Sequence, residues 1–136
     1  MPSRHITTEI IIRSNQKCDA IVSEIVNDDV GLYRKEDDGD AQYYLCIDPI
    51  PKESAEETVL SLCELIEGLS EGGRSEWKSA ISREFYMGFE VSLSSLPFYH
   101  EHFKPSTLAR VSALDTELGF ALYPEEVESK SAPDEN

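Results

Sequence analysis

The sequence predicts an α+β domain: a four-stranded sheet with helices on one face, in the element order β-α-β-α-β-α-β. Three observations predict it. Apolar residues recur at every second position in some segments and three or four positions apart in others, which are the periods of strands and helices. Glycine or proline separates most of these segments. The length of 136 residues and the hydrophobic content of 40% suit one core, so we expect a single domain over 1–124.

The predicted order implies two β-α-β halves. Helices in the first and last connections would act as right-handed crossovers between parallel strands. We therefore expect a sheet like that of a ferredoxin-type split β-α-β sandwich, with an extra helix between the second and third strands. Residues 125–136 contain acids, one lysine and little apolar surface, and they predict a disordered acidic tail.

The first strand and the first helix are predicted within residues 5–27. β-branched residues fill nearly every place from 5 to 13, and Ile6, Ile10 and Ile12 share one face of an extended chain. Apolar residues then recur at helical spacing and predict a helix over about 16–27; they are Cys18, Ile21, Val22, Ile25 and Val26.

An acidic loop and a second strand follow. Residues 27–42 are rich in glycine and in acids, and they predict a loop. Residues 42–47 alternate between apolar and more polar side chains, which predicts a strand. This strand stops at Pro49 and Pro51, because proline cannot donate a backbone hydrogen bond.

A capping box begins the second predicted helix. Ser54 and Glu57 have the spacing at which the serine hydroxyl accepts from the Glu57 amide and the glutamate reaches back to the Ser54 amide. The pair Gly72-Gly73 predicts the left-handed stop of this helix. Its apolar stripe is Val59, Leu62, Cys63, Ile66 and Leu69.

The third strand is the clearest in the sequence. Apolar and polar residues alternate from Phe85 onwards, and Arg83 interrupts the apolar face, so we expect the ladder to begin at about 84. Trp77, just before this strand, either closes the core between the second helix and the sheet or anchors a partner at the surface. Tyr44 and Tyr86 fall on the more polar faces of their strands, and they either lie under helices or form an aromatic surface.

A third helix and a short last strand complete the prediction. After a loop over 94–104, Pro105 suits the first turn of a helix. The helical apolar spacing continues to Leu118, and Gly119 would end the helix. Residues 120–123 then predict the last strand.

The net charge is −15, from 12 lysines and arginines against 27 aspartates and glutamates. This charge excludes a conventional binder of DNA, RNA or an anionic membrane, because such polyanions recruit cationic side chains. No signal peptide and no membrane-spanning apolar run is visible, so we expect a cytoplasmic protein. Cys18, Cys46 and Cys63 lack metal-binding spacing and lie among apolar residues, so we expect reduced, buried thiols.

Catalytic, metal and cofactor chemistry has weak support in the sequence. No nucleophile elbow, P-loop or dinucleotide fingerprint is present, so we expect neither an enzyme nor a cofactor. His100 and His102 share a face in extended backbone, but no third ligand is evident, so we expect a surface loop and no metal site. The alternative function is a small ligand-binding regulator, or an enzyme of unknown activity, with a pocket near His100 and His102.

Two clusters of acids form the predicted partner-binding site, one on the acidic loop and one on the outward side of the second helix. Such a surface repels nucleic acid and steers a cationic protein, although solubility alone would also explain it. The predicted site residues are Asp28, Asp29, Glu36, Asp37, Asp38, Asp40, Glu53, Glu56, Glu57, Glu64, Glu67 and Glu71.

Three stretches of the C-terminal half carry a resemblance to known proteins. They are Ser75-Glu76-Trp77, Phe85-Tyr86-Met87-Gly88-Phe89-Glu90-Val91, and the ending Leu114-x-x-x-Leu118-Gly119-Phe120-Ala121-Leu122-Tyr123-Pro124. The chain resembles an uncharacterised bacterial domain family that occurs among the immunity proteins of polymorphic toxins. With the charge, the resemblance implies an intracellular immunity protein that occludes the active site of a cognate toxin. A cationic nuclease is the toxin that the charge favours, and we expect the protein to be a monomer or a weak homodimer.

Overall fold

The computed structural model describes residues 4–36, 39, 41–49, 52, 54–92 and 100–124. Within these residues the chain forms five strands and four helices. In chain order they are β1 (Arg4–Ser14), α1 (Asp19–Ile25), β2 (Gly31–Glu36), β3 (Tyr43–Asp48), α2 (Ala55–Glu67), α3 (Glu71–Ser79), β4 (Ser82–Val91), α4 (Pro105–Ala113) and β5 (Glu117–Pro124). The predicted tail, 125–136, lies outside the described residues.

The strands form one mixed sheet in the order β2-β3-β1-β4-β5. β1 lies at the centre and pairs antiparallel with β3 and with β4. At the edges, β2 runs antiparallel to β3 and β5 runs parallel to β4, so α4 joins two parallel strands as predicted, although a split β-α-β unit would place another strand between them. The four-stranded, ferredoxin-like order is wrong, because the described sheet has a fifth strand and β1 is antiparallel to β3.

The fifth strand, β2, lies in the segment predicted as a loop. All of its residues are exposed, because an edge strand that no helix covers buries neither of its faces. The apolar alternation that reveals a half-buried strand is therefore missing from it. β2 pairs with β3 from Gly31 opposite Asp48 to Glu36 opposite Tyr43. This hairpin reverses the chain direction, and β3 consequently enters the sheet antiparallel to β1.

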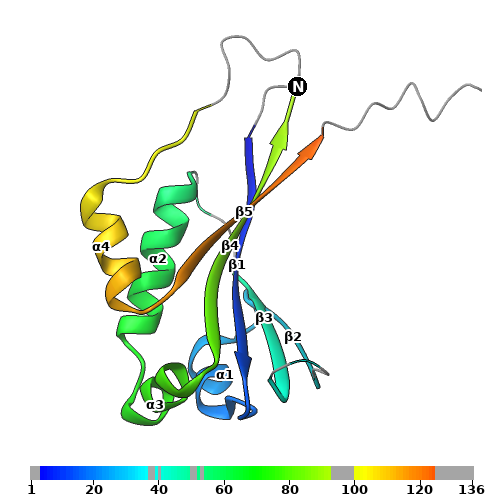
Figure 1. The fold of residues 1–136 in the computed structure, drawn as a ribbon, viewed down its shortest axis with the longest axis vertical. Helices are drawn as coiled ribbons and strands as arrows, with labels where there is room; N and C mark the ends of the chain where they lie inside the picture. The colour runs from blue at the N-terminus through cyan, green and yellow to red at the C-terminus, as the bar shows by residue number, and fades with distance from the viewer. Residues whose placement is uncertain are drawn as a thin grey trace, which may run out of the picture.

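The described helices pack on one face of the sheet, and the core lies between them and the strands (Figure 1). Ile10 and Ile12 of β1 and Phe85 and Met87 of β4 are fully buried there. α2 contributes the predicted stripe of Val59, Leu62, Cys63 and Ile66. None of the described helices is both long and apolar enough to cross a membrane.

The glycine pair that was predicted to stop a helix lies in the first turn of α3. This helix begins after Ser70, whose hydroxyl accepts a hydrogen bond from the Gly73 amide at 3.2 Å. Neither Gly72 nor Gly73 has a positive φ, so neither makes a left-handed stop. Trp77 of α3 is only 3% exposed, and its Nε1 donates to the Leu114 carbonyl at 3.0 Å. The interpretation of Trp77 as a core residue is confirmed, and that of a surface anchor is wrong.

α4 ends at Ala113, well before the predicted stop at Gly119. Asp115 adopts a left-handed conformation with φ of 55°, which aspartate tolerates because its short polar side chain can hydrogen-bond locally. Leu118 therefore lies in β5, opposite Phe85, and packs against the core. The spacing of Leu114 and Leu118 suits a helical stripe in the sequence, but the structure divides the two residues between a helix end and a strand.

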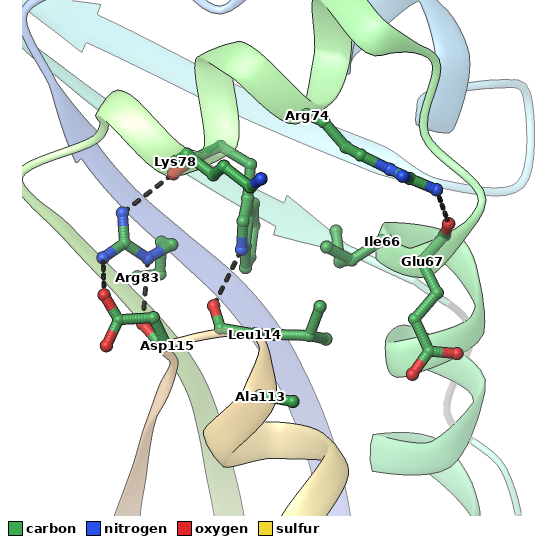
Figure 2. A pocket seen from close by; sticks show the side chains of 9 residues that line it. Ile66, Glu67, Arg74, Lys78, Arg83, Ala113, Leu114 and Asp115 are labelled. Carbon is green, nitrogen blue, oxygen red and sulfur yellow. Dashed lines mark hydrogen bonds and ion pairs between the residues drawn. The ribbon is translucent and has the colours of Figure 1, made fainter.

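Arg83 belongs to β4, which begins at Ser82, slightly earlier than predicted. Its side chain lies on the helix-covered side of the sheet and is 8% exposed. The guanidinium donates to the carbonyls of Trp77 and Asp115 and forms an ion pair with the Asp115 carboxylate at 2.9 Å (Figure 2). It also donates to the Ala80 carbonyl. Two of these carbonyls belong to the end of α3, where Trp77 also accepts from the Ala80 amide at 3.3 Å. Arg83, which interrupts the apolar alternation in the sequence, is thus a buried side chain that donates hydrogen bonds.

Candidate functional site

The described acids of the predicted loop lie at the two ends of β2. Asp28 and Asp29 are exposed in the turn before β2, and Glu36 is exposed at the other end of this strand. At about 3.3 Å per residue, the strand keeps the two groups roughly 17–20 Å apart. Four further predicted site residues lie outside the described residues: Asp37, Asp38, Asp40 and Glu53.

Two of the predicted helix acids, Glu56 and Glu67, contact the α4 region. The Glu56 carboxylate accepts from the Lys104 amide at 2.7 Å and from the Thr107 hydroxyl at 2.8 Å. The Glu67 carboxylate forms a two-armed ion pair with Arg110 at 2.6 and 3.0 Å. The bond from the Lys104 amide lowers the pKa of Glu56, and the bonds from Arg110 lower the pKa of Glu67. The other predicted acids of this region are exposed: Glu57, Glu64 and Glu71.

Glutamates from neighbouring elements bind the N-termini of the described helices in reciprocal pairs. Glu76 on α3 accepts from the first amides of α1, and Glu24 on α1 accepts from the amide of Ser70 at the start of α3. Glu101, before α4, accepts from the first amide of α2, and Glu56 on α2 accepts at the start of α4. Carboxylates suit these positions because the first amides of a helix lack partners and the dipole is positive there. Part of the acidity near the helices therefore has a structural role.

His100 and His102 lie side by side, with ring centroids 5.3 Å apart, and both are exposed. Glu101 between them contacts α2 instead. In the described part of the chain no group of three histidine, cysteine, aspartate or glutamate side chains is arranged to hold a metal ion. Two hollows in the described surface lie elsewhere and include neither histidine. The structure brings the histidines together but brings no third ligand to them among the described residues.

The second face of the sheet carries no described helix (Figure 1). Successive side chains of a strand point to opposite faces, so alternate residues of the strands project from it. A β-bulge between His5 and Thr7 places Ile6 beside Gly88 on this side, away from Ile10 and Ile12, with which it was predicted to share a face. We call this surface the open face. Its members are Arg4, Ile6, Thr7, Glu9, Ile11, Arg13, Gly31, Tyr33, Lys35, Tyr44, Cys46, Asp48, Ser82, Glu84, Tyr86, Gly88, Glu90, Glu117, Gly119, Ala121 and Tyr123.

Two pairs of tyrosines lie on the open face, one pair on β2 and β3 and the other on β4 and β5. The rings of Tyr33 and Tyr44 meet edge to face, with centroids 6.4 Å apart. The hydroxyls of Tyr86 and Tyr123 are 3.5 Å apart. The Tyr123 ring lies over Gly88, where a Cβ atom would come within 3.1 Å of it. Tyr44 and Tyr86 are half-buried on the uncovered side, so the interpretation of these residues as an aromatic surface is confirmed.

Two carboxylates lie together on the β4–β5 side of the open face. Glu84 and Glu117 lie directly opposite each other on β4 and β5, and neither has a cationic partner among the described residues. The Glu84 carboxylate covers Gly119 so closely that a Cβ atom there would overlap it. Burial, and then the charge of Glu117, raise the pKa of Glu84.

The rest of the open face carries acids and bases in equal number, and Arg4 and Glu90 form an ion pair there at 3.1 Å. Burial, and then the charge of Glu9, raise the pKa of the half-buried Cys46 thiol to about 12, so this cysteine is a poor nucleophile. All three thiols are unpaired, and Cys18 and Cys63 are buried as expected, but the expectation of a buried Cys46 is wrong because its side of the sheet carries no described helix (Figure 1). The acids of the open face, Glu9, Asp48, Glu84, Glu90 and Glu117, outnumber its bases, Arg4, Arg13 and Lys35.

Sequence patterns missed these carboxylates because they lie far apart in the chain and only strand pairing brings them together. The available indication was the alternation of Glu84, Tyr86 and Glu90 along the polar face of the third predicted strand. An uncovered surface of tyrosines and carboxylates is suited to contact a protein that presents lysine or arginine. Comparisons with protein-family models, with curated proteins and with solved structures find no match.

Proposed function

We propose that this protein is a binding protein of the immunity type, which neutralises a cationic bacterial toxin by covering its active site with the open face. The observation that carries the proposal is the opposed pair Glu84 and Glu117, which lies beside tyrosines on a sheet face that no described helix covers. Like charges directly opposite each other destabilise a sheet. A lysine or arginine of a partner would replace this repulsion with attraction.

The class of partner follows from the charges. The net charge of −15 repels polyanions and steers a cationic protein toward the encounter. A nuclease is cationic where it binds the phosphates of its substrate, so an electronegative face complements that site. Tyr86 and Tyr123 supply rigid, amphipathic contact area at a small cost in side-chain entropy. These features support a cationic nuclease as the toxin.

The experiment measures binding of the purified protein to the toxin domain encoded beside its gene. The variant Glu84→Gln/Glu117→Gln keeps the side-chain shapes of the open face but removes two negative charges. We expect its Kd to be at least about tenfold higher than that of the wild type, because close interfacial charge pairs contribute 1.5 kcal/mol or more. We also expect the association rate to depend less on salt.

The matched control is Glu57→Gln/Glu64→Gln, which removes the same charge from the exposed side of α2. Unchanged binding by this control, together with weaker binding by the open-face variant, supports the proposal. The proposal is contradicted by equal affinities of the wild type and the open-face variant. It is equally contradicted by a gene neighbourhood that encodes no toxin.

A further inference from the structure

A hollow of about 480 Å³ opens on the helix side of the molecule, between α2, α3 and the end of α4 (Figure 2). Its volume lies within the range of about 300–1,000 Å³ that is typical of sites for small molecules. Ile66, Leu114 and the buried Trp77 provide apolar walls. The hollow is remote from the open face, because α2, α3 and α4 cover the other side of the sheet.

Most of the charged groups around the hollow already have partners. The guanidinium of Arg83 donates to three backbone carbonyls and to Asp115, so Arg83 and Asp115 neutralise each other. The carboxylate of Glu67 is likewise paired with Arg110 at 2.6 Å. Neither of the two acids that line the hollow therefore presents an uncompensated negative charge to it.

Two cations of the hollow, Arg74 and Lys78, keep uncompensated charges. They lie one turn apart on α3, at positions i and i+4, and therefore on the same side of the helix. Arg74 extends across the hollow and donates from Nη2 to the Glu67 carbonyl at 2.8 Å, an uncharged acceptor (Figure 2). Glu71 lines an adjoining hollow together with Arg74 and Lys78. Within the described residues, neither cation forms an ion pair with it or with any other carboxylate.

We infer that this hollow binds a small carboxylate with an apolar body, such as an aryl or alkyl acid. The remaining N–H groups of Arg74 and the Lys78 ammonium would hold the carboxylate, since guanidinium and ammonium donors make charge-assisted hydrogen bonds to it. Trp77, Ile66 and Leu114 would contact the apolar body. An anion without an apolar body would leave these walls empty, and an uncharged ligand would leave both cations without a counterion. This site is separate from the open face and does not depend on toxin binding.

Trp77 is the single tryptophan of the chain, so its fluorescence reports on the hollow directly. The experiment titrates the full-length protein with phenylacetate, with its uncharged analogue phenylacetamide and with inorganic phosphate. The second readout is the NMR signal of the Trp77 indole N–H, which donates to Leu114. We expect a saturable response to phenylacetate, and an apparent Kd at least about tenfold higher for each of the other two probes.

The variant Arg74→Gln/Lys78→Gln removes both cations, and Lys78→Gln alone provides a variant that leaves the Arg74 contact with α2 in place. We expect the double variant to weaken phenylacetate binding at least tenfold and the single variant to weaken it severalfold. The control Lys17→Gln/Lys52→Gln removes two exposed cations elsewhere and should bind like the wild type. The inference is overturned by a non-saturable response to phenylacetate, by equal binding of phenylacetamide or phosphate, or by equal loss in the control.

Discussion

Arg83 connects three parts of the chain through one buried side chain. Arg83 lies on β4, and its guanidinium donates to carbonyls at the end of α3 and to the carbonyl of Asp115, just after α4. The carboxylate of Asp115 is 91% exposed, so the ion pair alone contributes little to stability. The hydrogen bonds to the carbonyls contribute most of the stability that Arg83 provides, because a buried acceptor that loses its donor costs about 1 kcal/mol or more.

Replacing this arginine should therefore destabilise the fold strongly. For Arg83→Met we expect the free energy of unfolding to fall by about 2–4 kcal/mol, because the Ala80 and Asp115 carbonyls lose the guanidinium and the Trp77 carbonyl keeps only the Ala80 amide at 3.3 Å. Urea denaturation followed by Trp77 fluorescence measures it. Lys17→Met, at an exposed position, should stay within about 0.5 kcal/mol of the wild type. A loss below 1 kcal/mol for Arg83→Met would show that water can replace the guanidinium.

Glu84 is expected to destabilise the fold when it is ionised, because burial, and then the charge of Glu117, favour its protonated form. Its raised pKa means that the folded state binds the proton more tightly than the unfolded state. Stability should therefore fall as the pH rises from the ordinary glutamate pKa through the raised value, and the penalty persists above it. We expect Glu84→Gln to be more stable than the wild type at neutral pH, by up to about 1 kcal/mol for these partly solvated carboxylates. Urea midpoints between pH 4 and 8 provide the measurement, and a variant less stable than the wild type at neutral pH would contradict the prediction.

At the scale of elements, the reciprocal capping by glutamates couples the helices in two pairs. Glu76 and Glu24 tie α1 to α3, and Glu56 and Glu101 tie α2 to the α4 region. α1 has only seven residues, and its N-cap residue Cys18 makes no side-chain capping bond, so a cap from outside the helix satisfies its first amides. Short helices gain most of their stability from such tertiary contacts and not from propensity.

These caps predict a pH dependence opposite to that of Glu84. Hydrogen bonds from Ser70 lower the pKa of Glu24, and the bond from Lys104 is the main cause of the lowered pKa of Glu56. Stability from these carboxylates is complete above the ordinary glutamate pKa and is lost as the pH falls through the lowered values. We expect Glu24→Gln/Glu56→Gln to be less stable than the wild type at pH 7, with a difference that shrinks below about pH 4.

The control for this prediction is Glu64→Gln, which removes one exposed charge from α2 without removing a cap. Thermal unfolding monitored by circular dichroism at pH 3, 5 and 7 compares the three proteins. If the loss of stability in the double variant were independent of pH, the shape of the glutamate side chains, and not their charge, would explain how the caps stabilise the helices.

Elements that bury a face were predictable from the sequence, and those whose boundaries depend on distant partners were not. β1, α2, β3 and β4 carry clear periods, because each places alternate or helically spaced side chains against the core. β2 carries no such period, since all of its residues are exposed. The end of α4 was predicted too far along the chain because Leu118 fits the helical spacing. The helix ends instead before Asp115, whose left-handed conformation follows the last turn and whose carboxylate contacts Arg83 of β4.

At the scale of the whole molecule, the sheet has two unlike sides. Helices, the core and the hollow with Arg74 and Lys78 lie on one side, and the open face with its tyrosines and carboxylates lies on the other. The two proposed sites can therefore be tested independently, because variants of one site lie on the far side of the sheet from the other. On the helix side Glu24, Glu56 and Glu67 are engaged in caps and an ion pair, whereas Glu84 and Glu117 of the open face have no cationic partner among the described residues.

Little of the candidate site could be predicted from the sequence. Alternation placed Tyr44 and Tyr86 on the polar faces of their strands, and this part of the prediction is confirmed. The predicted acidic clusters followed from runs of neighbouring acids, whereas Glu84 and Glu117 are isolated in the chain. Their proximity results from the parallel pairing of β4 with β5, a contact that local patterns do not encode.

Composition and local periodicity were enough to predict the α+β class, the strong negative charge and the elements that face the core. The fifth strand, the antiparallel placement of β3, the reciprocal caps and the pair of opposed carboxylates became evident only in the folded chain. The difference lies in the range of the interactions. A hydrophobic period extends over a few neighbouring residues, whereas an edge strand, a helix cap or a pair of opposed carboxylates depends on partners that only the folded chain brings together.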